Sequence, residues 1–131
     1  MAPLTDADLA FDVASRFERA RAGEAWNDAW AILSPSSQTS FGLVEQFVLD
    51  ETAYNANGGT AFVVTEPSQD PGLTEQLLGS RRQAVGTEAD LERAYVVLIT
   101  HPGVPATSGG TRAYLAAPLI VGGEWRLWPL A

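Results

Sequence analysis

The stretch GEAWNDAWAILSP, residues 23–35, decides how the N-terminal third of the chain folds. Its apolar residues recur at helical spacing and predict a helix over 24–33, with one face made by Trp26, Ala29, Trp30 and Leu33. Pro35 ends this helix, because the residue before a proline avoids helical geometry. The two tryptophans either fill a core or line a pocket. We expect core packing, because aromatic stripes at this spacing are mostly buried.

Two further helices are predicted on either side of this stretch. Thr5 and Asp8 resemble a capping pair, and the apolar residues that follow recur at helical spacing up to Gly23, so a helix is expected over 5–22. A third helix is expected to begin near Ser37 or Ser40 and to run to Tyr54. The sequence NANGG that follows is a strong terminator.

The rest of the chain is predicted to be mainly β structure. Residues 60–65 are β-branched and aromatic and indicate a strand, 66–72 a loop and 73–78 at most a short helix. Residues 82–85 are expected to form a weak strand, and the clearest strands are 92–101, 111–121 and 124–130, the last two joined by a two-residue turn at 122–123. Pro118 and Pro129 indicate an edge, a bulge or a strand end. Helices first and strands afterwards predict an α+β fold, with the helices packed on one face of a curved antiparallel sheet.

Composition places the chain among single-domain globular proteins. With 131 residues and 46% hydrophobic residues, it can bury a core as one domain, 1–131, and its apolar runs are too short to cross a membrane. It has no cysteine and one histidine, so we expect no metal site and no cofactor. The first ten residues lack the blocks of a signal peptide, which predicts a cytoplasmic protein; an exported domain without its signal would look the same.

Charge is distributed unevenly along the chain. All eight basic residues are arginine and none lies between Arg21 and Arg81, whereas that interval holds eight carboxylates and the net charge is −8. A field of this sign repels phosphate backbones and anionic lipid, so we expect neither nucleic acid nor membrane as a partner. A solubilising acidic surface is the simpler interpretation, and a docking face for a cationic protein is the alternative.

The order of elements, the WNDAWAILSP pattern after an Ala-Gly-Glu helix end, a third helix with a Phe and the closing GGEWRLW hairpin resemble the superfamily of nuclear transport factor two. They are most similar to small actinobacterial domains of that fold found in lipoproteins and in proteins of unknown function. The resemblance covers most of the chain. It implies a cone in which the sheet curls around the helices and leaves a pocket at its wide end.

Relatives in that superfamily include enzymes resembling ketosteroid isomerase, polyketide cyclases and limonene epoxide hydrolase, together with binding and dimerisation modules. The resemblance places Phe17 where the isomerase has its catalytic tyrosine, and phenylalanine cannot donate a hydrogen bond. The isomerase's aspartate base and the hydrolase's Asp-Arg-Asp set have no equivalent here. No family active site therefore carries over to this chain.

A few polar side chains have the chemistry that a catalytic site requires. His101 is the one side chain with an ordinary pKa near neutrality, and it is in phase with Tyr95 on its strand, while Arg112 and Tyr114 share one face of the next strand. These four residues are candidate acid, base and orienting groups, with Asp12 as a further carboxylate; a turn-capping role is the simpler interpretation of His101. The candidate ligand-binding residues are Trp26, Trp30, Phe17, Tyr95 and Tyr114.

Three functions remain open from sequence. The first is a non-catalytic module of the cone fold that binds a small apolar molecule or a protein and forms a homodimer through the sheet. The second is a small pocket enzyme of isomerase, cyclase or epoxide hydrolase type. The third is an acidic immunity or inhibitor protein that uses the carboxylates of 24–75 against a basic target.

Overall fold

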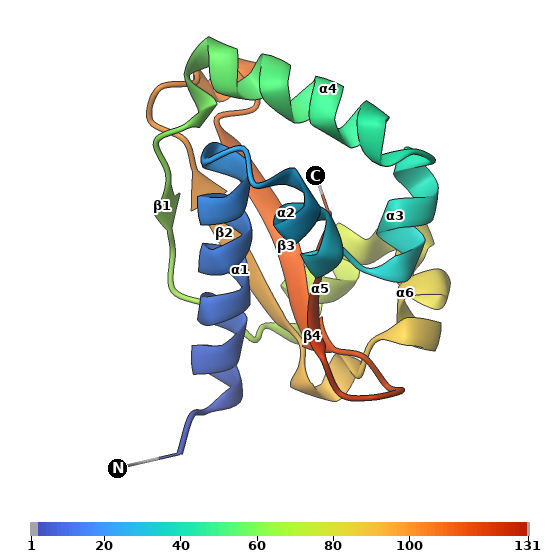
Figure 1. Cartoon of the computed structure of the whole chain (residues 1–131). Helices are drawn as coiled ribbons and strands as arrows, with labels where there is room; N and C mark the ends of the chain where they lie inside the picture. Colours follow the sequence, from blue (N-terminus) through green and yellow to red (C-terminus); the bar gives the residue numbers. More distant parts are fainter. Residues whose placement is uncertain (1–2, 131) are drawn as a thin grey trace.

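The computed structural model describes residues 3–130, and its core element is a twisted antiparallel sheet with helices in front and behind (Figure 1). The four strands follow one another in the order β1-β2-β3-β4. Their bounds are Val63–Val64 for β1, Tyr95–Thr100 for β2, Thr111–Pro118 for β3 and Trp125–Pro129 for β4. The helices are α1 (Asp6–Ala22), α2 (Trp26–Ile32), α3 (Pro35–Phe41), α4 (Val44–Tyr54), α5 (Pro71–Leu78) and α6 (Arg82–Glu88). The fold is α+β, as predicted.

The N-terminal helices pack on one face of the sheet. The Thr5 hydroxyl accepts a hydrogen bond from the backbone N–H of Asp8, whose carboxylate accepts one from Thr5 N–H, so the predicted capping pair begins α1. The apolar stripe of α1 meets β2, β3 and β4 in a first core, whose fully buried members are Ala10, Val13, Ala14, Phe17, Ala29, Leu33, Phe47, Val97, Ile99, Ala116 and Leu127. This layer is the predicted packing of helices on sheet.

A second layer covers the other face of the sheet. Leu78 of α5, Val85 of α6 and Ala89 join a core with the outward residues of three strands, Val96, Ala113, Leu115, Ala117 and Trp128. The sheet face predicted to form a homodimer is therefore covered to a large extent by the chain's own helices (Figure 1).

The predicted third helix is two helices. Ser34 caps α3 by accepting from Ser37 N–H, and Pro35 occupies the first turn, where its missing N–H costs nothing. Gly42 then takes φ 84°, a left-handed conformation that ends α3 before α4 begins at Val44. The expected start at Ser37 or Ser40 was therefore late, and the break at Gly42 was missed.

The β region is shorter than predicted. Residues 82–85 belong to α6 rather than to a strand. The predicted strand was wrong because a run of four residues is too short to show its period. β1 covers only Val63–Val64, and β3 and β4 are joined by a loop longer than the expected two residues, with Leu119 N–H donating to Glu124 O on either side of it. Pro118 and Pro129 are the last residues of β3 and β4, which confirms them as strand ends.

Glu24, in the turn between α1 and α2, is the one non-glycine residue of the described chain with a positive φ, 60°. A side chain in this region costs roughly 1 kcal/mol. We expect Glu24→Gly to raise the free energy of unfolding by about 0.5–1 kcal/mol, measured by thermal or urea unfolding.

Ala31→Gly is the matched control, because Ala31 lies exposed within α2 and glycine there should lower the free energy of unfolding by about 1 kcal/mol. Equal losses in both variants would contradict a strained Glu24.

Candidate functional site

A pocket opens where α1 and α4 meet the inner face of β3 and the end of β4. We call it the β3 pocket; its volume is about 290 Å³. Its lining is mostly aromatic and aliphatic, with a few polar groups at one side: Phe17, Leu33, Phe41, Phe47, Asp50, Glu51, Arg112, Tyr114 and Pro129. An apolar cavity of this size with few convergent polar groups is the usual form of a small-molecule site.

The polar side of the β3 pocket is a paired charge on neighbouring elements. Arg112 of β3 donates to both oxygens of Glu51 of α4, at 2.6 Å to Oε1 and 3.2 Å to Oε2. The Arg112 guanidinium also lies 3.6 Å from the centroid of the Tyr54 ring. This bidentate and stacked arrangement fixes the guanidinium plane, so the pair presents a rigid polar wall.

Tyr114 supplies the hydrogen-bond donor of the β3 pocket. Its ring packs against Phe17 with centroids 5.6 Å apart, and the residue is 3% exposed. Burial raises the pKa of the Tyr114 phenol, and the Glu18 and Glu51 carboxylates raise it further. The phenol therefore stays protonated and can donate to a ligand oxygen.

Behind the pocket wall lies a buried charge cluster of Glu18, Arg21, Glu51, His101 and Arg112. Arg21 donates to Glu18 Oε2 from Nη2 at 2.8 Å and from Nε at 3.1 Å, and both side chains are fully buried. Arg21 Nε lies 4.0 Å from Glu51 Oε1, which joins this ion pair to the Glu51–Arg112 pair of the pocket. Two carboxylates and two guanidiniums balance, which makes burial of the four charges tolerable.

His101 sits inside this cluster with both ring nitrogens in contact with protein atoms. Nδ1 lies 2.9 Å from the Tyr54 hydroxyl, and that hydroxyl donates to Gly109 O at 2.6 Å. Because the Tyr54 proton is used on Gly109, the Nδ1 position carries the proton that joins His101 to Tyr54. Nε2 lies 3.0 Å from Glu18 Oε2 and 3.1 Å from Arg21 Nη2, so it donates to the carboxylate when protonated and accepts from the guanidinium when neutral.

Glu18 is held ionised by these contacts. Burial alone would raise its pKa, but the hydrogen bonds and charges of His101 and Arg21 outweigh burial and place the pKa below its ordinary value. Its second oxygen, Oε1, is buried without a hydrogen-bond partner among the described residues. All side-chain contacts of Glu18 with Arg21 and His101 are therefore made through one carboxylate oxygen, Oε2.

The structure brings together some of the predicted catalytic residues and separates others. Arg112 and Tyr114 line the β3 pocket, and Ile99 and Val97 face them across the β2–β3 ladder. Tyr95 lies at the other end of β2, about 20 Å from His101 at ~3.3 Å per residue.

Two of the other predicted residues do not fit a catalytic role. Asp12 is exposed on α1, where it pairs with Arg16 at 2.8 Å, and it does not line the pocket. His101 is fully buried, so the expected turn-capping residue without partners is instead part of a network.

The predicted ligand-binding aromatics also divide. Phe17 and Tyr114 line the β3 pocket, while Tyr95, Trp26 and Trp30 do not. Trp30 is half-buried and packs on Phe47 and Phe41, with centroids 5.5 Å and 6.0 Å away, in agreement with core packing. Trp26 meets Phe47 edge-on at 6.1 Å and leaves its other side in an open groove between α2 and α4.

Sequence reasoning missed Glu18, Arg21, Glu51 and Tyr54. The signal was present in the helical period, because Glu18 and Arg21 continue the apolar stripe of α1 after Ala14 at spacings of four and three residues. Glu51 and Tyr54 extend the stripe that contains Phe47 in the same way. Charged residues on the apolar face of a helix indicate buried, paired charges.

The chain matches no protein-family model, no curated protein and no solved structure. Within residues 3–130, no group of three or more His, Cys, Asp and Glu side chains is placed to hold a metal ion. None of the helices in that range has the length and apolar character that a bilayer span requires.

Burial of His101 changes what its removal should do. Sequence alone suggests that His101→Ala leaves stability nearly intact, but in the structure it would open a cavity and leave buried partners unpaired. We expect the free energy of unfolding to fall by about 3 kcal/mol in urea unfolding. Thr111→Ala, at the exposed start of β3, should change it by less than about 0.5 kcal/mol, and an equally small effect of His101→Ala would show that the cluster does not depend on the imidazole.

The low pKa of Glu18 predicts a pH-dependent contribution to stability. A carboxyl whose pKa is lower in the folded than in the unfolded chain stabilises the fold above its ordinary pKa, 4.5, and loses this effect as pH falls through the folded value. Glu18→Gln should therefore cost about 3–5 kcal/mol at pH 7 and progressively less below pH 4.5, in denaturant titrations at several pH values.

Glu66→Gln is the control, because Glu66 is exposed and its carboxylate makes no hydrogen bond or ion pair with the described residues. A cost of Glu18→Gln that stays constant from pH 7 to 3 would contradict the ionised, hydrogen-bonded Glu18 described above.

Proposed function

We propose that this protein is a non-catalytic binding module that holds a small, neutral, largely apolar molecule in the β3 pocket. The observation that carries the proposal is the pocket's composition: an aromatic and aliphatic lining, one protonated phenol and a charge pair that is already satisfied. A site of this kind binds by burial of apolar surface and orients its ligand by one or two hydrogen bonds.

The charge of the pocket supports a neutral ligand. Arg112 is engaged by both oxygens of Glu51, so its positive charge is balanced within the wall. Asp50 adds a further carboxylate at the lining. An anionic ligand would meet net negative charge here, whereas a ketone or an alcohol would accept a hydrogen bond from Tyr114.

The enzyme alternative loses His101, the general base predicted for it. Both nitrogens of His101 contact protein atoms and the ring is fully buried, so the imidazole is closed to a ligand in the β3 pocket. Of the five predicted catalytic residues, Arg112 and Tyr114 remain at the pocket, and neither is poised to remove a proton, since one is a paired cation and the other a protonated phenol.

We also propose that the chain has the cone-shaped fold of the nuclear transport factor two superfamily, which its sequence resembles. Helices against the inner face of a curved antiparallel sheet, with a pocket at one end, are the arrangement expected of a cone of the nuclear transport factor two type. The polar residues of this chain's pocket differ from the enzymes of that superfamily, which favours a binding role.

The test compares two ligands of similar size and opposite charge. Native mass spectrometry of the purified protein first shows whether a small molecule is retained. Isothermal titration calorimetry then compares the affinity of the protein for 1-tetralone, a neutral ketone, with its affinity for 1-naphthoate, an anion. We expect the ketone to bind and the carboxylate to bind at least tenfold more weakly.

A single hydroxyl tests the role assigned to Tyr114. Tyr114→Phe should weaken 1-tetralone binding by about three- to tenfold, because one hydrogen bond contributes about 0.5–1.5 kcal/mol. Tyr95→Phe is the matched control and should leave binding unchanged, since Tyr95 lies outside the pocket. Absence of ketone binding, or a preference for the carboxylate, would overturn the proposal.

A further inference from the structure

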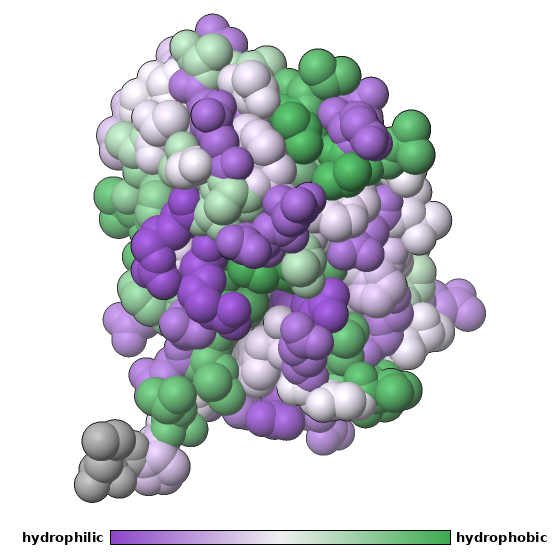
Figure 2. Space-filling model, in the orientation of Figure 1, coloured by the Kyte–Doolittle hydropathy of each residue, from purple (hydrophilic) through white to green (hydrophobic). Residues whose placement is uncertain are grey.

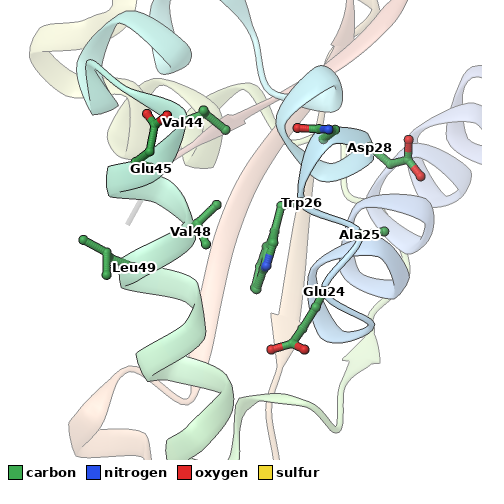
Figure 3. A pocket seen from close by; sticks show the side chains of 9 residues that line it. Glu24, Ala25, Trp26, Asp28, Val44, Glu45, Val48 and Leu49 are labelled. Carbon is green, nitrogen blue, oxygen red and sulfur yellow. The ribbon is translucent and has the colours of Figure 1, made fainter.

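A second hollow of the surface is independent of the β3 pocket. It is an open groove between α2 and α4, with a volume of about 820 Å³ (Figure 3). We call it the α2–α4 groove; it is lined by Glu24, Ala25, Trp26, Asn27, Asp28, Val44, Glu45, Val48 and Leu49. None of these residues lines the β3 pocket.

The floor and one wall of the α2–α4 groove are apolar. The Trp26 indole stands between the helices with Val48 of α4 opposite it (Figure 3), and Leu49 of α4 contributes to the lining. Leu49 is 66% exposed, and Leu43, just before α4, is 68% exposed. Figure 2 shows apolar residues gathered over this part of the molecule. Exposed leucines beside a tryptophan are typical of an interaction surface.

The rim of the α2–α4 groove carries negative charge alone. Glu24 and Asp28 lie on the α2 side and Glu45 on the α4 side, and no arginine lines the groove. None of these three carboxylates has a hydrogen bond or an ion pair to a side chain of residues 3–130. Of the nearest arginines along the chain, Arg21 is fully buried, whereas Arg19 is exposed and lines a separate hollow with Asp28. The charges of Glu24 and Glu45 are therefore available to a partner.

The groove also holds a free donor. Trp26 Nε1 makes no hydrogen bond within the part of the chain that the structure describes. Because Trp26 is half-buried and keeps one face in the groove, its indole offers both apolar area and an N–H to an occupant. Tryptophan is one of the residue types that most often contribute strongly to protein–protein binding.

We propose that the α2–α4 groove binds an amphipathic, basic segment of a partner protein, whose apolar side chains contact Trp26, Val48 and Leu49 and whose Lys or Arg side chains pair with Glu24 and Glu45. Charge complementarity selects this occupant. A second copy of this chain would bring its own net charge of −8 toward the same rim and is disfavoured.

The test uses a fluorescein-labelled amphipathic peptide of leucine and lysine, with the same peptide carrying glutamate for lysine as its partner probe. Fluorescence anisotropy with the full chain should show binding of the lysine peptide and at least tenfold weaker binding of the glutamate peptide. Raising NaCl from 0.05 to 0.5 M should weaken the lysine peptide several-fold, because exposed charges are then screened.

Variants with equal net charge separate the groove from general acidity. The double substitution Glu24→Gln with Glu45→Gln should weaken binding of the lysine peptide about fivefold or more. Glu66→Gln with Glu92→Gln removes the same charge from exposed carboxylates elsewhere and should change binding less than twofold. Equal effects of the two pairs would overturn the proposal, since the peptide would then respond to net charge.

The apolar part is tested in the same way. Leu49→Ser should weaken binding of the lysine peptide about fivefold. Val121→Ser, at a residue 86% exposed in the β3–β4 loop, should leave the binding of this peptide unchanged. Both residues are exposed, so neither substitution should lower the melting temperature appreciably. No binding of the lysine peptide, equal binding of both peptides, or equal effects of the two serine variants would each overturn the assignment.

Discussion

The position of Arg21 at the end of α1 is the constraint on which the packing of residues 55–59 and the buried charge cluster depends. Its guanidinium donates to Glu18 on the same helix, to Asn55 Oδ1 at 2.5 Å and to Gly59 O at 2.5 Å. The Asn55 amide donates back to Arg21 O at 3.0 Å. One side chain thus fixes the chain that leaves α4 against the end of α1, and a buried guanidinium with fewer partners would carry a large desolvation cost.

The contacts of Arg21 also explain why His101 is shielded from solvent while the β3 pocket is open. The segment 55–59 passes so close to Gly103 that a Cβ on Gly58 would lie 2.1 Å from Gly103 O, so the two loops shut the space around His101. On the other side of the same cluster, Glu51 turns from Arg21 toward Arg112 and reaches the β3 pocket. Buried charge on one side therefore positions the polar wall on the other.

Local signals in the sequence were sufficient for the helices and strands that carry a strong period or a cap, such as α1 and the β2–β3 pair. They failed at Gly42, because a single glycine within a continuing apolar period does not show that it takes a left-handed conformation. They also failed at 82–85, where packing against the second core decides that the segment is helical. Arg112 and Tyr114 were predicted as site residues from a shared strand face. Glu18 and Arg21 are recognisable only from the helical period, because a charged residue on a buried stripe has a partner on another element.

The distribution of arginine links the interior to the surface. Arg21 and Arg112 neutralise carboxylates in the buried charge cluster, Arg81 donates to Pro129 O and Leu130 O, and Arg126 donates to Leu33 O. Half of the eight cations are thus used to hold the core and the chain ends of the sheet. No basic residue lies between Arg21 and Arg81, and the groove residues Glu24 and Glu45 have no ion pair within residues 3–130. The same scarcity of cations that makes the interior charge-balanced leaves this outer surface acidic, and a chain with lysines on α4 would have lost that asymmetry.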